Sequence, residues 1–436
     1  MNKILMRRIY LDYAASTPMA PEVKKAMEPY FGYLSNKGFG NPGSLHFFGQ
    51  EAMAAVDKSR EIIAKAIGAD FREIIFTGSA TEANNLVLRG SLAELRRQDA
   101  KLRRQDAKPR GNRIIISAIE HPSILETARD LEKEGTEVIY IPVDKNGIVE
   151  LKKIKKALNE RTILVSIMYA NNEIGTIEPI KEIAEIIQRF KATNASESPK
   201  NIIQRSESPK NIFVNSDKFV VWDRYPLFHT DAVQAFQYLN CQVSDLKVDL
   251  MTLSAHKIYG PKGIGVLYVK EQNNILPFIV PIITGGGQEF GLRSGTENVP
   301  LIVGFSEAVK IISHSRPKEI KRMNQLSQYF WKEIKKIFPK AEINGIEPGR
   351  DKRLPNICNI FFPGYSAEEL LIKLDLNGLA VSTGSACSAR AFKPSEVLRA
   401  LGLSQSRIKN SLRFSFGKFL TMSDIKEALK KIKAVL

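Results

Sequence analysis

The sequence has few cysteines, and their spacing excludes two kinds of site. Its 436 residues contain three, Cys241, Cys358 and Cys387, which lie far apart in the chain. No two of them form a CxxC pair, so the sequence predicts neither a zinc site nor a disulfide framework. Disulfides are rare in reducing compartments, and we therefore expect a cytoplasmic protein.

Long apolar runs are missing as well. No run approaches the about 18–20 apolar residues that a membrane-spanning helix needs. The first eight residues are basic, but they lack the apolar core and the small-residue cleavage site of a secretory signal. The sequence therefore predicts no membrane segment and no signal peptide.

Acidic residues are in the minority, with 47 Asp and Glu against 64 Lys and Arg, and the net charge is +17. A nucleic-acid-binding protein would cluster this excess and interleave it with aromatic residues. The densest basic cluster, residues 96–113, has no aromatic residue and alternates with Asp99 and Asp106. A solvated helix or loop is the better interpretation, and we expect no direct role with nucleic acid.

What the sequence does contain is an alternation of strand-like and helix-like segments. The strand candidates are the apolar runs 73–77, 113–117, 138–142, 162–167, 226–230 and 249–254. Such alternation is typical of an α/β fold with a mostly parallel sheet that helices cover on both faces. After about Pro317 a second α/β pattern begins. We predict a large domain over 18–317 and a smaller domain formed by 318–436 together with 1–17.

Two short duplications interrupt this pattern. Arg-Arg-Gln-Asp-Ala-Lys begins at Arg96 and again at Arg103, and Ser-Glu-Ser-Pro-Lys-Asn-Ile begins at Ser196 and again at Ser206. Solenoid repeats have periods of about 20–50 residues and run through the whole chain, so these copies do not form one. We interpret them as insertions, near 96–110 and 191–223, in loops between a helix and the next strand. Such loops lie at the sheet edge opposite the ligand site. A partner-binding insertion is the alternative.

Polar residues follow several of the predicted strands. The turn Gly78–Thr81 opens a helix, where free backbone N–H groups favour an anion such as phosphate. Asp231 follows another strand, where a carboxylate can pair with a protonated ring nitrogen. Lys257 follows a third, where partial desolvation suits a lysine to Schiff-base chemistry. Singly, these residues are better explained as helix caps and a surface lysine. Together they are the groups that pyridoxal phosphate needs.

Three further residues are candidates for the chemistry. His121 also follows a strand, where it could stack on the cofactor ring and shuttle protons. Cys387 lies among small residues that indicate a mobile loop, whereas Cys241 and Cys358 fit the usual buried cysteine. Arg413 lies on the polar face of an alternating strand, where it could bind a substrate carboxylate or simply face solvent.

Taken in order, these motifs resemble the cysteine desulfurases of the NifS/IscS-like group, within the class V aminotransferases. The resemblance runs from Ile9 to the C-terminal helix. Its most specific pieces are Gly40-Asn41-Pro42, Ala80-Thr81-Glu82, Asn171-Asn172-Glu173-Ile174-Gly175, His256-Lys257, Arg293-Ser294-Gly295-Thr296 and Ser385-Ala386-Cys387. It implies the fold type I of pyridoxal-phosphate enzymes.

The resemblance also implies a set of residues that bind pyridoxal 5′-phosphate. Lys257 would hold the cofactor covalently, Asp231 would pair with its ring nitrogen, and Gln234 would contact its ring oxygen. His121 would stack on the ring and act in proton transfer. The others would bind the phosphate or lie beside the cofactor: Ala80, Thr81, Asn172, Ser254, His256 and, from the second subunit of a homodimer, Thr296.

The implied reaction removes sulfur from L-cysteine and releases L-alanine. Asn172 and Arg413 would hold the substrate carboxylate, and Lys257 would move the Cα proton. The Cys387 thiolate would take the sulfur as a persulfide and deliver it to an acceptor protein for iron–sulfur cluster assembly or tRNA thiolation.

Two related activities are the alternatives, a selenocysteine lyase and another class V aminotransferase. Both would keep Lys257 and Asp231 without needing a cysteine nucleophile. The small-residue segment around Cys387 argues against the aminotransferase and only weakly against the lyase. The interval from Asn172 to Asp231 is longer than is usual in the family, which leaves the sulfur acceptor open.

Overall fold

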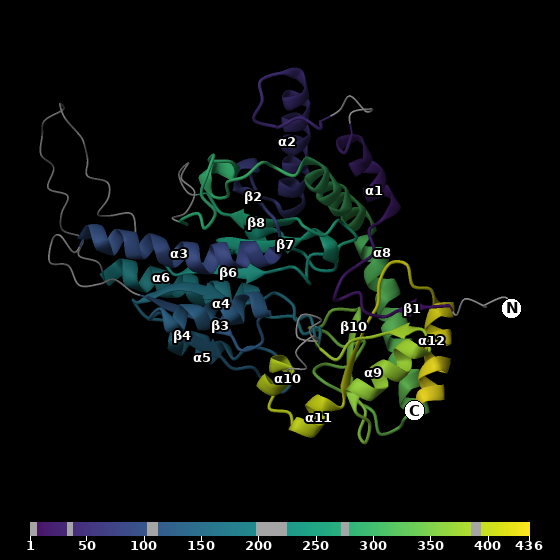
Figure 1. Ribbon diagram of the computed structural model, residues 1–436. Coiled ribbons are helices and arrows are strands. Elements are labelled where there is room, and N and C mark those ends of the chain that lie inside the picture. Colours follow the sequence, from purple (N-terminus) through teal and green to yellow (C-terminus); the bar gives the residue numbers. More distant parts are fainter. Residues whose placement is uncertain (1–6, 33–37, 103–111, 198–224, 272–278, 385–393) are drawn as a thin grey trace, which may run out of the picture.

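A computed structural model describes residues 7–32, 38–102, 112–197, 225–271, 279–384 and 394–436 (Figure 1). Its largest element is a seven-stranded sheet. In spatial order its strands are β2 (Ile74–Thr77), β8 (Gly265–Val269), β7 (Leu250–Ser254), β6 (Leu227–Asp231), β5 (Thr162–Ser166), β3 (Arg113–Ser117) and β4 (Glu137–Ile141). Only β8 runs antiparallel to its neighbours. The predicted α/β fold with a mostly parallel sheet is therefore confirmed.

Helices cover both faces of this sheet, as the buried strand sequences require. Strand β5 (Thr-Ile-Leu-Val-Ser) is buried at every position, which is typical of a parallel strand covered on two sides. One face packs against α3 (Ala80–Leu102) and α4 (Pro122–Lys133). The other face packs against α2 (Phe47–Ile67), α6 (Ile180–Glu197) and α8 (Val299–Ile337). Shorter helices complete this part: α1 (Pro21–Met27), α5 (Leu151–Ala157), α7 (Val243–Leu246), and the 3₁₀ turns η1 (Glu28–Tyr30), η3 (Phe71–Glu73), η7 (Ala255–Lys257) and η8 (Glu289–Gly291).

A second, smaller part packs beside the seven-stranded sheet (Figure 1). It contains a three-stranded antiparallel sheet of β12 (Ser411–Ser415), β10 (Ile357–Phe361) and β9 (Glu342–Ile343). A two-stranded parallel sheet joins the chain start, β1 (Ile9–Tyr10), to β11 (Leu379–Ala380). Its helices are α9 (Ala367–Leu376), α10 (Glu396–Ala400), α11 (Gln405–Lys409) and α12 (Met422–Val435).

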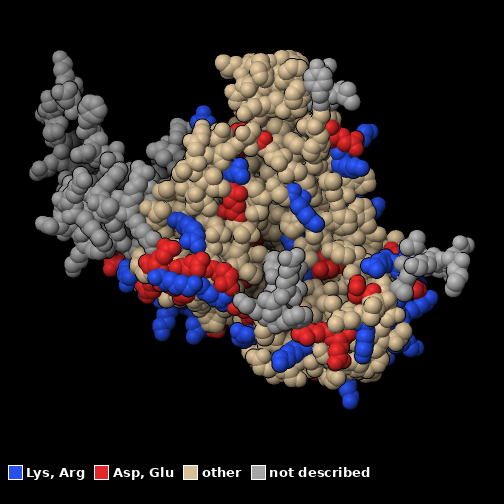
Figure 2. Space-filling model, viewed as in Figure 1, with Lys and Arg blue, Asp and Glu red and all other residues tan. Residues whose placement is uncertain are grey.

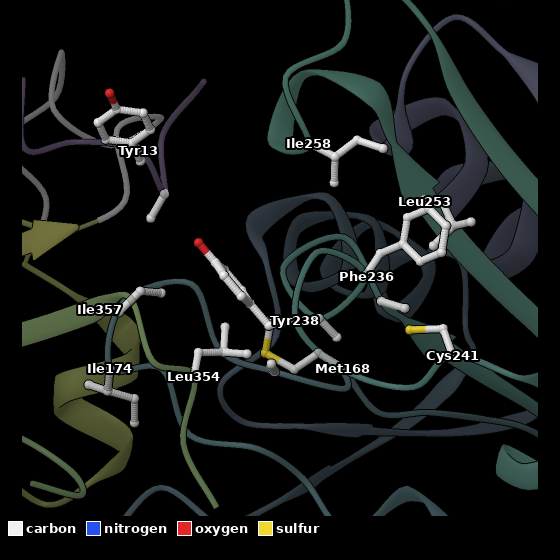
Figure 3. Packing of buried hydrophobic residues seen from close by; sticks show 14 of the residues in the cluster. Tyr13, Met168, Ile174, Phe236, Tyr238, Cys241, Leu253, Ile258, Leu354 and Ile357 are labelled. Carbon is white, nitrogen blue, oxygen red and sulfur yellow. The ribbon is translucent and has the colours of Figure 1, made fainter. Parts of the chain in front are cut away.

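The long helix α8 joins the two parts. It passes through Pro317 without ending, so the predicted boundary between 317 and 318 falls inside a continuous helix. One apolar core also runs from one part to the other. Figure 3 shows Met168 and Tyr238 from the larger part beside Leu354 from the smaller part. The division into two domains at that boundary stays a prediction.

Three local features differ from what the sequence predicts. Strand β8 is not among the strand candidates. Helix α3 continues to Leu102, through the first Arg-Arg-Gln-Asp-Ala-Lys copy that we expected in a loop, since most of those residues are good helix formers. Ser366 precedes α9 at the Ser-x-x-Glu spacing of a capping box, but its side chain makes no capping hydrogen bond. In the described part of the chain, no helix is long and apolar enough to cross a membrane.

Candidate active site

A cavity of about 320 Å³ opens at the carboxyl ends of the parallel strands, where the two parts of the fold meet. This is the edge at which ligands bind in parallel α/β sheets. The predicted site residues that line the cavity are Ala80, Thr81, His121, Asn172, Asp231, Gln234, Ser254, His256, Lys257 and Arg413. Cys387 lies outside the described residues, and Thr296 is exposed and is not part of the lining.

Lys257 reaches the cavity from the 3₁₀ turn η7, directly after β7. Its Nζ donates to the carbonyl oxygens of Ala14 at 2.6 Å and Ala15 at 2.7 Å. These carbonyls belong to the segment that follows β1, and Gln234 Nε2 also donates to Ala14 at 3.0 Å. The start of the chain therefore forms one wall of the site and holds the lysine amine in place.

Asp231 ends β6 and is almost completely buried. Its Oδ2 accepts a hydrogen bond from Asn84 Nδ2 at 2.9 Å, and its Oδ1 accepts from the backbone N–H of Val233 at 3.0 Å. A carboxylate held in this way, with its surroundings fixed, can pair with a protonated ring nitrogen in the cavity.

His121 is the N-cap of α4, and Pro122 occupies the first helical position. Its Nδ1 contacts the backbone N–H of Ser123 at 3.1 Å and the Ser123 hydroxyl at 2.8 Å. Burial lowers the pKa of His121. Asp231 opposes that shift and Lys257 adds to it. The ring is thus fixed by the helix start, and its neutral form is favoured.

The start of α3 lies in the cavity wall, where the sequence predicts a phosphate-binding turn. Ser79, Ala80 and Thr81 line the cavity beside Ser254 and His256, and the first backbone N–H groups of a 23-residue helix favour an anion. Gly265 lets β8 approach this turn, because a Cβ there would lie 2.6 Å from the carbonyl carbon of Ser79. Burial above all, together with Lys257 and Lys262, lowers the pKa of His256 to about 3, so this imidazole is neutral near pH 7.

Arg413 enters the cavity from β12 of the smaller part and is fully buried. Its Nη2 forms an ion pair with Asp12 at 2.7 Å, and its Nη1 donates to the backbone oxygen of Asn172 at 2.9 Å. Its Nε has no partner among the described residues. A buried donor without a partner, in the wall of a cavity, is suited to bind a ligand carboxylate.

Several residues of the site were not predicted from the sequence. Asn84, Ser123 and Asp12 contact Asp231, His121 and Arg413 respectively. Asn84 lies one helical turn after the predicted phosphate site, and Ser123 lies two residues after His121. The sequence therefore places both close to predicted site residues. Asp12 gave no comparable signal, because its partner is 401 residues away.

The residues of this cavity fit pyridoxal phosphate. The donor set includes a lysine amine, a buried carboxylate and the N-terminus of a helix, which match the aldehyde, the ring nitrogen and the phosphate of that group. Arg413 remains to bind a second anionic group.

Comparison with known proteins agrees with this chemistry. Residues 9–198 and 223–428 match the model of the class-V aminotransferase family. The chain belongs to that family. Cysteine desulfurase IscS of Dictyoglomus turgidum is 40% identical over 432 residues, which cover 99% of this chain and 95% of that protein. Cysteine desulfurase IscS of Rickettsia typhi is 38% identical over 431 residues, with 99% and 91% covered.

Solved structures give the same answer. A NifS-like protein superposes with a TM-score of 0.80 at 31% identity, covering 98% of this chain and 99% of its own. A NifS-like protein from Rickettsia africae superposes with a TM-score of 0.76 at 29% identity, with 98% and 99% covered. The predicted resemblance and the fold type I architecture are confirmed, and with them the dependence of this family on pyridoxal phosphate. The roles of single residues stay predictions.

Proposed function

We propose that this protein is a cysteine desulfurase that converts L-cysteine into L-alanine and takes the sulfur as a persulfide on Cys387. The observation that carries the proposal is the single cavity in which Lys257 and Asp231 of the larger part meet Arg413 of the smaller part. Relatives named cysteine desulfurase, aligned over nearly the full chain, support the same activity.

The larger part would hold the cofactor. Lys257 would bind it covalently, Asp231 would pair with its ring nitrogen, and Gln234 would contact its ring oxygen. The start of α3, Ser254 and His256 would bind the phosphate. When bound, pyridoxal phosphate supplies an electron sink that acidifies the Cα proton of an amino acid.

The smaller part would hold the substrate. Arg413 is fixed by Asp12 and by the Asn172 carbonyl, and it keeps Nε for the carboxylate of L-cysteine. Lys257 lies in the same cavity and would move the Cα proton. The carbonyls of Ala14 and Ala15 hold its amine when it is not attached to the cofactor, so the base stays in reach of the substrate.

Cys387 would take the sulfur. Its thiolate attacks the substrate sulfur, and an S–S bond forms as the Cβ–S bond breaks. The electron pair of the broken bond stays on the substrate carbon, where protonation completes alanine. Ser395, which follows segment 385–393 in the sequence, supports this role, because its Oγ donates to Glu173 at 2.5 Å and Glu173 is next to Asn172 of the cavity.

The test is incubation of the purified protein, loaded with pyridoxal phosphate, with L-cysteine, measuring alanine and sulfide. We expect Lys257→Ala to abolish both products and Cys387→Ala to abolish sulfide release. Cys241→Ala is the matched control, because Cys241 is buried and its burial raises the thiol pKa to about 12. Unchanged sulfide release by Cys387→Ala would refute the persulfide. Turnover of selenocysteine alone would favour the lyase.

The homodimer, with Thr296 reaching the phosphate site of the other subunit, is also part of the proposal. Around the start of α2, the large apolar side chains of Phe39, Leu45 and Phe47 are exposed. Figure 2 shows that the surface over this region, at its top, is almost free of charged residues. Such a patch on a protein surface favours a protein partner, and a second copy would cover it.

Sedimentation of the loaded protein tests this dimer. Leu45→Glu, at a side chain that is 91% exposed, is expected to shift the dimer toward monomer and to weaken phosphate binding. Leu376→Glu in α9, also well exposed at 72%, is the control and should leave the dimer intact. A monomeric wild-type protein with full activity would contradict the proposal.

The acceptor of the sulfur completes the proposed function. A cytoplasmic acceptor protein, either an iron–sulfur scaffold or a carrier for tRNA thiolation, would receive the persulfide sulfur. We expect the net charge of +17 to favour an acidic acceptor. Transfer of labelled sulfur from the persulfide enzyme to candidate acceptors tests this step, and fractionation of cells tests the compartment.

A further inference from the structure

Along one wall of the cavity, four side chains form a continuous series of hydrogen bonds: Asp231, Asn84, Ser123 and His121. The larger part of the fold supplies all four, from β6, α3 and α4. Only one assignment of donors and acceptors is consistent along these four residues. That assignment also fixes which nitrogen of the His121 ring carries the proton.

Asn84 donates to the residues on both sides of it, and this fixes the direction of the other hydrogen bonds. It is completely buried, and its Nδ2 carries two protons and has two partners, Asp231 Oδ2 at 2.9 Å and Ser123 Oγ at 2.8 Å. The reverse orientation of the amide would place its oxygen against the Asp231 carboxylate, and two acceptors repel each other. Nδ2 therefore donates to both.

Ser123 in turn donates a hydrogen bond to His121. Its hydroxyl already accepts from Asn84, so its single proton is free to donate to His121 Nδ1 at 2.8 Å. The backbone N–H of Ser123, which can only donate, also points at Nδ1, at 3.1 Å. Nδ1 is thus an acceptor, and the one proton of the neutral ring is on Nε2.

We propose that Asn84 and Ser123 fix His121 as the Nε2–H tautomer, so that Nε2 of the ring carries the proton that His121 contributes to proton transfer. This inference rests on the proposed function only in that it takes the ligand of the cavity to be the cofactor with its substrate. Ser123 and Asn84 are positioning residues, because they act through His121.

The geometry explains why the ring resists a second proton. An added proton would have to sit on Nδ1, against two donors, and would break the N-cap of α4. The charged and titratable groups that act on the ring are Asp231, Lys257 and His256. Burial and Lys257 outweigh Asp231 and lower the pKa of His121, in agreement with a neutral ring.

The test is ¹⁵N NMR of the histidine-labelled protein near neutral pH, without and with pyridoxal phosphate. Loss of one signal pair in His121→Gln assigns the ring. We expect Nδ1 of His121 to resonate as an unprotonated nitrogen and Nε2 as a protonated one. A protonated Nδ1 in the wild-type protein would overturn the proposal, and this measurement needs no variant that alters the chain of bonds.

Variants of Ser123 sharpen the result. Ser123→Ala is expected to mix the two tautomers and to lower kcat about fivefold, the loss of one hydrogen bond, with KM unchanged because Arg413 still holds the substrate. Ser123→Thr keeps a hydroxyl and should restore the single tautomer. Ser91→Ala is the matched control, since Ser91 is also buried in α3 and its hydroxyl has no partner among the described residues.

An unchanged His121 spectrum in Ser123→Ala would overturn the role of Ser123. A protein with the expected tautomer that releases no sulfide from cysteine would refute the proposed function and leave this inference standing.

Discussion

The two parts of the fold contribute to the cavity in different ways. Residues of the larger part reach it from the ends of parallel strands, and each lies within a few residues of its strand, as Asp231 and Lys257 do. The smaller part reaches it through pairing between distant segments, because Arg413, which lines the cavity, is held by Asp12 near the start of the chain. The larger part thus builds its half of the site by local structure. The other half exists only after the two parts have packed together.

The largest expected effect lies in the larger part. Lys257→Ala removes the amine that would bind the cofactor, so we expect activity to fall by at least about 100-fold and the visible absorbance of the bound cofactor to disappear. The fold should persist, because the lysine side chain is only partly buried. Retained absorbance with retained activity would show that the cofactor is held in another way.

The next effect lies in the smaller part. Asp12→Asn removes the charge that partners the fully buried Arg413, and breaking such a pair costs about 3–5 kcal/mol of unfolding free energy. We also expect KM for L-cysteine to rise, because Arg413 loses its fixed position. Urea unfolding and steady-state kinetics measure the two effects. A change in stability alone would mean that Asp12 serves only the packing of the two parts.

A smaller and pH-dependent effect is expected at Glu120, which precedes His121. Glu120 is buried and accepts from Ser117 Oγ and the Met168 N–H, and burial raises its pKa to about 8. Between about pH 4.5 and 8 the unfolded state loses this proton while the folded state keeps it. The carboxyl therefore destabilises the protein increasingly as pH rises through that window, and adds nothing below it.

Glu120→Gln tests this expectation, because an amide oxygen can accept the same two hydrogen bonds. We expect the variant to gain stability over the wild type by about 1–3 kcal/mol on going from pH 5 to pH 8. Denaturant unfolding at the two pH values measures the gain. A difference that does not depend on pH would mean that Glu120 is ionised in the folded protein.

The smallest effect is expected where the two parts meet at the surface. Arg129 of α4 pairs with Glu396 of α10 at 2.6 Å, and both side chains are more than one-third exposed. Glu396→Gln should change the unfolding free energy by less than about 1 kcal/mol, because water screens an exposed pair. A loss as large as that in Asp12→Asn would mean that this surface contact, rather than the buried pair, joins the two parts.

Prediction from sequence was most successful where polar site residues directly follow a strand. Apolar runs such as 162–167 predicted strands, and the polar residues after them were predicted to meet at one sheet edge, where His121, Asp231 and Lys257 do line one cavity. Strand β8 was missed, since an antiparallel strand between two others has no crossover helix to reveal it. Asn84 was missed although it lies one helical turn after the predicted phosphate site, because its partner Asp231 is 147 residues away in the sequence.

Local patterns along the chain are enough to predict the fold class, the family and the residue types of the site, because hydrophobic periodicity and short motifs are local properties. Three contacts of the site became known only from the folded chain: Asp12 pairs with Arg413, Ala14 and Ala15 hold Lys257, and Asn84 connects Asp231 to Ser123. Each of these contacts joins groups that are far apart in sequence. Buried polar groups must find partners wherever packing brings them, and no local pattern records which partner that will be.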